Sequence, residues 1–207
     1  NMLNSTKRLL ALGSVLTIGL TGCSGTPTYD PAPKSAGGSG WNYLVGPGDS
    51  VNVFVWRNTD VSGTFPVRPD GKMTMNLIED MQASGKTPTQ LARDIEAALS
   101  KYIQEPIVTV VVAGGVGPFD QQVRVIGEAA KPQALNYREK MSLVDLMIAV
   151  GGLTEFAAGD KAYVLRTVDG KPAKLGVRLE SLLKDGDIDA NVDLLPGDVL
   201  VIPESLF

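Results

Sequence analysis

Apolar residues along this chain gather in short runs whose spacing separates strands from helices. Valine, isoleucine and aromatic residues dominate residues 51–56, 107–112 and 122–127, a composition typical of β-strands. The run at 107–112 is continuous and carries no charge, so we expect it to be a buried strand. A further β-branched strand is predicted at 199–202.

Two segments repeat apolar residues at the helical period. The first follows Thr87-Pro88-Thr89-Gln90, which combines an N-cap threonine, a proline at the first helical position and a glutamine three residues after the cap. The second follows Ser142, has Asp145 at the third helical position, and ends at Gly151-Gly152, where a left-handed residue is required. The expected apolar faces are Leu91, Ile95, Ala98, Leu99 and Tyr102 in the first helix, and Leu143, Leu146, Met147 and Val150 in the second.

Turn residues divide the strands. Pro69-Asp70-Gly71 and Asp169-Gly170 each lie between two strand patterns and predict hairpins. Pro47-Gly48-Asp49 and Pro196-Gly197-Asp198 both lead into a β-branched strand. Proline presets φ at the second turn position, and glycine accepts the positive φ of the third. The two triplets are either an internal repeat or, more simply, one turn used independently before two core strands.

These elements predict an α+β fold of two small sheet-plus-helix domains, because strands outnumber helices and each helix is isolated between strands. Gly114-Gly115-Val116-Gly117-Pro118 is the expected boundary. We therefore expect one domain over 41–116 and a second over 117–207. The 207 residues are enough for two small cores.

The start of the chain is typical of a secretory signal. Lys7 and Arg8 precede an uncharged, mostly apolar run at 9–22. A membrane-spanning helix needs about 20 apolar residues, and this run is shorter. We therefore expect residues 1–22 to be a signal peptide that is removed from the mature protein.

The signal ends in a sequence that resembles a bacterial lipobox, Leu20-Thr21-Gly22-Cys23. In a lipobox the cysteine is acylated and becomes the mature N-terminus, so Cys23 is the expected site of lipid attachment. Ser24 follows in place of aspartate, which in lipoproteins implies sorting to the outer membrane. Residues 23–40, rich in Pro, Gly and Ser, are expected to form a flexible tether.

Composition excludes several kinds of function. The chain has no histidine and one cysteine, which removes Ser-His and Cys-His catalysis, imidazole zinc sites and intramolecular disulfides. A net charge of −4 argues against nucleic-acid binding, which needs a surplus of Lys and Arg. Gly85-Lys86-Thr87 resembles the end of a P-loop, but Asp80 stands where the leading glycine belongs. We expect no enzyme activity, no metal, and no cofactor besides the acyl chains on Cys23.

Several motifs, taken in order, resemble the polysaccharide export (Wza-type) family. Those that resemble its export domain are Tyr43-Leu44-Val45-Gly46-Pro47-Gly48-Asp49, Pro66-Val67-Arg68-Pro69-Asp70-Gly71 and Pro106-Ile107-Val108-Thr109-Val110. Those that resemble the neighbouring soluble-ligand-binding β-grasp (SLBB) domain are Val123-Arg124-Val125-Ile126-Gly127, Ala149-Val150-Gly151-Gly152-Leu153-Thr154 and Leu195-Pro196-Gly197-Asp198-Val199. Residues 151–159 and 202–207 resemble the branch associated with exosortase (PEP-CTERM) systems.

The resemblance implies an outer-membrane lipoprotein, anchored at the periplasmic face through Cys23, that assembles into a homo-oligomeric ring. Such a ring encloses an aqueous passage for secreted exopolysaccharide and docks onto an inner-membrane polysaccharide co-polymerase. Its role is that of a conduit without catalysis. Ring closure then uses head-to-tail interfaces between copies.

One departure from the family bears on the membrane. Family members that cross the outer membrane themselves carry a C-terminal amphipathic helix, whereas the sequence here ends at Phe207, shortly after its last strand. We therefore expect the polymer to pass to a separate outer-membrane β-barrel. Two alternatives stay open: a lipoprotein that binds glycans or scaffolds the machinery without forming a pore, and a periplasmic glycan-processing enzyme that uses acids such as Asp49 or Asp198. We expect these two aspartates to organise their turns instead.

Overall fold

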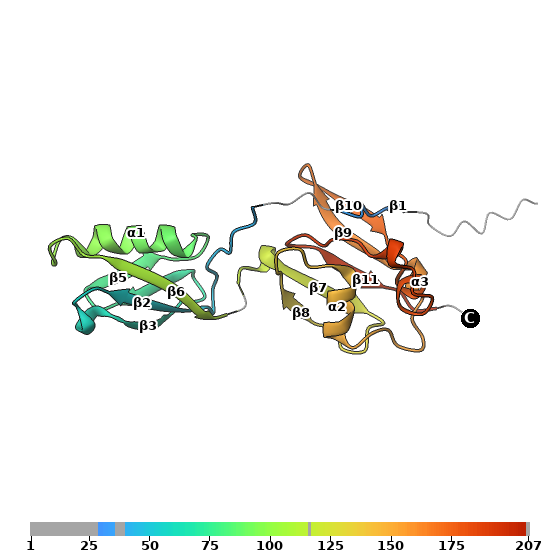
Figure 1. Cartoon of the computed structure of the whole chain (residues 1–207), viewed down its shortest axis with the longest axis horizontal. Coiled ribbons are helices and arrows are strands. Elements are labelled where there is room, and N and C mark those ends of the chain that lie inside the picture. Colours follow the sequence, from blue (N-terminus) through green and yellow to red (C-terminus); the bar gives the residue numbers. More distant parts are fainter. Residues whose placement is uncertain (1–28, 36–39, 116, 206–207) are drawn as a thin grey trace, which may run out of the picture.

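The structure, a computed structural model, describes residues 29–35, 40–115 and 117–205. Figure 1 shows two modules next to each other along the long axis: one contains β2 to β6 and α1, and the other contains β7 to β11, α2 and α3. The described residues form a six-stranded, a three-stranded and a two-stranded sheet. Mixed sheets with a few helices confirm the predicted α+β class.

The first module is a small sheet covered by one helix. Its central strand, β2 (Ser50–Val55), is antiparallel to both neighbours in the order β3–β2–β6. The other elements are β3 (Gly63–Pro66), β4 (Lys72–Met75), β5 (Ile78–Gln82), α1 (Pro88–Leu99) and β6 (Val108–Gly114), with the short 3-10 turn η1 (Thr59–Val61). Alternate residues of β2 and one face of α1 form the core, namely Val51, Val53, Val55, Leu91, Ile95 and Leu99.

The helix begins where the sequence predicts. The Thr87 hydroxyl accepts a hydrogen bond from the Gln90 backbone N–H at 3.2 Å, and the Gln90 side chain accepts one from the Thr87 N–H at 2.9 Å. The helix ends at Leu99, so Tyr102 lies beyond it and is 63% exposed. The expectation that Tyr102 belongs to the apolar helix face is therefore wrong.

β6 is buried on one face only. Val108 packs in the core, whereas Ile107 and Val111 are 61% and 55% exposed. These residues are exposed because α1 covers only one face of the three-stranded sheet. Nothing in the described part of the chain covers the other face. A continuous β-branched run does not distinguish a strand covered on both faces from one with an open face.

The second module is built on the six-stranded mixed sheet β1–β10–β9–β11–β7–β8. Its central strand β11 is parallel to β7 and antiparallel to β9. The elements are η2 (Phe119–Gln121), β7 (Gln122–Gly127), β8 (Ala134–Asn136), α2 (Leu143–Val150), η3 (Gly159–Lys161), β9 (Tyr163–Val168), β10 (Lys171–Gly176), α3 (Leu179–Leu183), η4 (Ile188–Ala190) and β11 (Val199–Ile202). The two α-helices pack on one face of the sheet and close the second core.

The N-terminal segment differs from the expected flexible tether. β1 (Asp30–Pro31) pairs in parallel with β10, and the Ala32 N–H donates to the Gly176 carbonyl at 3.0 Å. Ala32 is 8% exposed and belongs to the second core. The prediction is therefore wrong for residues 29–35. The open edge of β10 can take up an extended segment, and prolines favour that extended form.

The signal peptide and the acylated cysteine predicted for the start of the chain, Cys23 included, lie outside the described residues. Within the described ranges, no helix is both long and apolar enough to span a membrane.

Replacing Ala32 with aspartate tests the docking of this segment. Ala32→Asp forces an unpaired charge into the second core, and we expect either undocking of residues 29–35 or destabilisation by about 2 kcal/mol. Hydrogen exchange reports the change at the amides of residues 32 and 193, which donate to Gly176 and Lys34 carbonyls. Ser35→Asp, on an exposed residue of the same segment, is the control. Equal protection in the two variants would contradict the docked arrangement.

Candidate functional site

The two Pro-Gly-Asp turns, singled out by the sequence, share one local geometry. Gly48 and Gly197 both have φ of +87°, a conformation that favours glycine. The Asp49 carboxylate accepts the Gly46 N–H at 2.8 Å, and the Asp198 carboxylate accepts the Leu195 N–H at 2.8 Å. Each aspartate therefore closes its own turn by a bond to the N–H three residues earlier.

The turns also align the strand that follows, but in different topologies. The Gly48 N–H donates to the Val67 carbonyl beside an antiparallel pair, whereas the Gly197 N–H donates to the Gln122 carbonyl beside a parallel pair. The same kind of turn thus precedes a strand with an antiparallel neighbour in one module and a strand with a parallel neighbour in the other. This favours independent use of one turn over an internal repeat.

Asp198 forms the buried ion pair of the second module. Its carboxylate accepts hydrogen bonds from Nε of Arg166 at 2.9 Å and from Nη2 at 2.6 Å. The side chains are 6% and 1% exposed for Arg166 and Asp198. Nη2 of Arg166 also donates to the Asp193 carbonyl. Because both charges are buried, removal of one partner leaves an uncompensated ion.

Asp49 connects the first module to the segment that enters the second. Its carboxylate accepts the Tyr43 hydroxyl at 2.5 Å and the Gly117 N–H at 3.0 Å. Burial raises the pKa of Tyr43, and the hydrogen bond and negative charge of Asp49 raise it further. A Cβ on Gly115 would lie 1.8 Å from Oδ1 of Asp49. The linker therefore passes too close to Asp49 for any side chain at position 115.

The remaining turn residues also serve the fold. The Asp70 carboxylate accepts the Lys72 N–H at 3.1 Å and pairs with Arg68, and Gly71 has φ of +80°. The Arg68 hydrogen bonds, followed by that of Lys72, lower the pKa of Asp70 to about 2. Gly151 and Gly152 both have positive φ after α2, and the Gly152 N–H donates to the Met147 carbonyl. Gly151 and Gly152 therefore end a helix, and Asp70 and Gly71 close a turn. The strands on either side of that turn, β3 and β4, pair with β2 and β5 in separate sheets, so the hairpin predicted at Pro69-Asp70-Gly71 is wrong.

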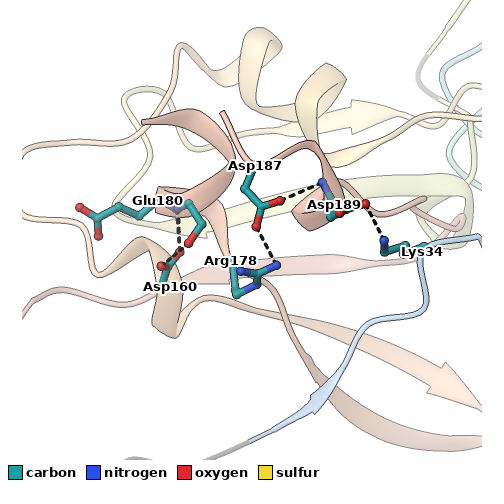
Figure 2. Close-up of polar contacts among 7 residues, drawn as sticks. Lys34, Asp160, Arg178, Glu180, Asp187 and Asp189 are labelled. Carbon is teal, nitrogen blue, oxygen red and sulfur yellow. Dashed lines mark hydrogen bonds and ion pairs between the residues drawn. The ribbon is translucent and has the colours of Figure 1, made fainter. Parts of the chain in front are cut away.

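A groove of about 620 Å³ lies where the docked N-terminal segment crosses the second module. Sequence patterns gave no sign of it, because its wall exists only once residues 29–35 pair with β10. Part of this region is drawn in Figure 2. Its lining includes Tyr29, Lys34, Asp160, Lys161, Arg178 and Asp189.

Arg178, Asp189 and Lys34 of this groove take part in one series of ion pairs and hydrogen bonds. Arg178 pairs with Asp187 at 2.9 Å, the Asp187 carboxylate accepts the Asp189 N–H, and Asp189 pairs with Lys34 at 2.7 Å. Figure 2 shows this series of contacts, which ends on the N-terminal segment. Lys34 and Asp189 are largely exposed, so their pair adds little stability.

Asp160 caps α3 from outside the helix. Its Oδ1 accepts the N–H groups of Glu180 and Ser181, each at 3.0 Å, and its Oδ2 accepts the Ser181 hydroxyl at 2.7 Å. Burial alone would raise the pKa of Asp160, but the Ser181 and Glu180 hydrogen bonds outweigh it, so the pKa lies below its ordinary value of 3.8.

The groove presents apolar side chains together with charged ones. Among the described residues, no group of three or more His, Cys, Asp or Glu side chains is placed to hold a metal ion. Asp160 is committed to a helix end, and Asp49 and Asp198 are committed to their turns. The arrangement suits binding by hydrogen bonds and surface charges.

Comparison with known proteins gives two family matches in chain order. Residues 38–113 match the model described as polysaccharide biosynthesis/export protein, and residues 122–175 match the SLBB domain. The chain is also 23% identical over 182 residues to the EPS I polysaccharide export outer membrane protein EpsA of Ralstonia solanacearum, covering 76% of this chain and 47% of that relative. The chain thus spans about half the length of the relative.

Asp198→Asn and Asp49→Asn are expected to destabilise the protein to different degrees. Asp198→Asn leaves the buried Arg166 charge unpaired and should lower the free energy of unfolding by about 3–5 kcal/mol. Asp49→Asn loses an acceptor for neutral donors and should cost about 1–3 kcal/mol. Urea unfolding measures both, with the exposed Asp185→Asn as control. The reverse order would contradict the roles assigned to the two carboxylates.

The cap on α3 predicts a defined pH dependence. Because the folded pKa of Asp160 is lowered, its contribution is present above the ordinary pKa of 3.8 and is lost as pH falls through the lower folded value. Asp160→Asn should therefore have a lower Tm at pH 6 and lose less Tm than wild type between pH 4 and pH 2. Thermal unfolding across this range checks it. Parallel curves for the two proteins would show that the cap does not titrate as described.

Proposed function

We propose, on the premise that this chain belongs to the polysaccharide export family with an SLBB domain, that it forms part of an exopolysaccharide export channel. In this proposal, copies assemble into a ring in the periplasm that guides the polymer through an aqueous passage. The ring performs no catalysis and needs no cofactor. Inner-membrane polysaccharide co-polymerase and a separate outer-membrane β-barrel are its expected partners.

The observation that carries the proposal is the order of the two domain matches. The export domain match at 38–113 comes first and the SLBB match at 122–175 follows. The relative EpsA is named as an outer membrane export protein, which supports a location at the outer membrane. Acylation of Cys23 would anchor the chain there, since each buried acyl CH₂ contributes about 0.8 kcal/mol and several chains act together.

The chemistry of the described residues fits a conduit. A moving polymer requires weak, repeated contacts, and one tight pocket would stall it. The buried carboxylates of Asp49 and Asp198 accept bonds from the fold itself. They are poorly placed to act on a glycosidic bond, which favours the conduit over a glycan-processing enzyme.

The groove beside the N-terminal segment favours a second candidate function. With a volume of about 620 Å³ and charged residues such as Lys34, Asp160 and Arg178 in its lining, it could hold part of a glycan in a lipoprotein that scaffolds the machinery without forming a pore. Assembly separates the two functions. Light scattering of the lipidated protein in detergent should detect closed multimers for a conduit and monomers for a scaffold.

A deletion strain tests the export function directly. We expect the strain to stop secreting its exopolysaccharide and to retain polymer within the envelope, because the passage is missing. Wild-type protein should restore secretion, and Cys23→Ser should not, because it lacks the anchor. Secreted and retained polysaccharide are measured separately.

Metabolic labelling with a palmitate analogue accompanies this experiment. The wild type and the control Ser24→Ala should be labelled, and Cys23→Ser should not. Labelling of Cys23→Ser would refute the anchor, and normal secretion by the deletion strain would refute the export function.

A further inference from the structure

The six-stranded sheet has one face that faces away from the helices. Strand positions on the other face, such as Val125, Val164 and Leu200, pack in the second core. The register places Arg124, Leu165 and Val199 on the opposite face, and none of them belongs to that core. The face away from α2 and α3 is therefore available to a ligand.

Four residues form one row across this face. Lys174 of β10 is opposite Leu165 of β9, Leu165 is opposite Val199 of β11, and Val199 is opposite Arg124 of β7. We call this row the cationic strip. Since neighbouring strands are about 4.8 Å apart, its two cations are separated by about 14 Å along the row. Lys174 is exposed, and the other three residues are half-buried.

The strand positions on this face carry only positive charge, although the whole chain has a net charge of −4. In β7, β9, β10 and β11, the positions that alternate onto it include two cations and no acid. These positions are Gln122, Arg124, Ile126, Tyr163, Leu165, Thr167, Pro172, Lys174, Gly176, Val199 and Val201. The strip therefore attracts an anionic group more strongly than the other positions on this face of the sheet do.

An aromatic pair positions the cation at one end of the strip. The rings of Tyr29 and Tyr163 lie 4.8 Å apart between centroids. Nζ of Lys174 lies 5.6 Å and 5.1 Å from these centroids, a distance at which a cation is attracted to an aromatic face. Lys174 is thus held over the sheet, with its ammonium exposed.

The cation at the other end has an unused donor. Nη2 of Arg124 donates to the Phe119 carbonyl at 3.2 Å, whereas its Nε is buried and has no partner among the described residues. The side chain lines a cavity of about 350 Å³ together with Asp120, Thr167 and Pro196. A buried donor without an acceptor is unfavourable, so an oxygen bound in this cavity would be stabilising.

These features match the chemistry of an acidic sugar. Carboxylates pair with Arg and Lys, sugar hydroxyls exchange hydrogen bonds with groups such as Asp120 and Thr167, and the C–H faces of sugar rings pack on apolar side chains. Asp120 lines the same cavity as Arg124, where its carboxylate can accept a hydrogen bond from a sugar hydroxyl. A neutral glycan would leave both cations of the strip unused.

We propose that the cationic strip binds a carboxylate-bearing saccharide segment, with Arg124 and Lys174 contacting its anionic groups and Leu165 and Val199 beneath its sugar rings. This inference rests on the proposed export function and deepens it, since it assigns the exported polymer to the acidic polysaccharides. Lys174 is exposed on the sheet and only Arg124 lines a cavity, so most of the strip is an open surface, which suits a polymer that must keep moving.

The test uses the full chain and two matched probes, trigalacturonate and neutral galactotriose. Isothermal titration should detect trigalacturonate binding that weakens as salt rises, and little binding of the neutral trimer. Arg124→Gln and Lys174→Gln should each weaken trigalacturonate binding by about two- to fivefold, the range for an exposed charge pair. Lys171→Gln is the matched control, because Lys171 is an exposed lysine of the same strand that alternates onto the other face.

Unchanged binding in both strip variants, an equal loss in Lys171→Gln, equal affinity for the two probes, or no binding of trigalacturonate would each overturn the proposal. Thermal unfolding of each variant checks that the fold is intact. The result is separable from the export function. If the deletion strain stops secretion but the purified chain shows no preference for the acidic probe, the proposed role of the cationic strip is refuted and the export function is still supported.

Discussion

The structure depends on two buried carboxylates that close Pro-Gly-Asp turns. An ionised group inside a protein is stable only if hydrogen bonds or an opposite charge replace its lost water. Asp49 meets this condition with the Tyr43 hydroxyl and two backbone N–H groups, and Asp198 meets it with the Arg166 guanidinium. Each carboxylate fixes the start of a central strand, β2 or β11, and the other strands of each sheet pair outward from there. Asp49 has a further role, because its bond to Gly117 attaches the end of one module to the start of the next.

Much of the fold could be predicted because it is encoded locally. The Thr87 cap, the glycines after α2 and the two Pro-Gly-Asp turns depend on residues within four positions of one another. The partners of the aspartates could not be predicted, since Arg166 lies 32 positions from Asp198 and Gly117 lies 68 from Asp49. The open face of β6 could not be predicted for the same reason, because it depends on which side of the sheet α1 covers.

The largest departure from expectation is the docked N-terminal segment, which forms one wall of the groove. Residues 29–35 have the composition of a flexible coil, rich in proline and without an apolar period, and only the free edge of β10 makes them ordered. Composition indicates how much conformational entropy a segment loses when it becomes ordered. It does not indicate whether another part of the fold provides contacts that compensate for this loss. For this reason the groove near Arg178, and the residues that line it, could not be predicted from the sequence.

Docking of this segment places the predicted anchor close in sequence to the surface proposed to bind the polymer. Tyr29 follows the predicted lipid site by six positions, and its ring packs at a tilt against Tyr163 near the ammonium of Lys174. If the segment leaves β10, Lys174 loses one of its two aromatic contacts and the groove loses a wall. A chain held to a membrane by its N-terminus would transmit tension first to this β1–β10 contact, which consists of few backbone bonds and an exposed ion pair. The segment that follows the predicted lipid site therefore also forms part of the surface proposed to bind the polymer.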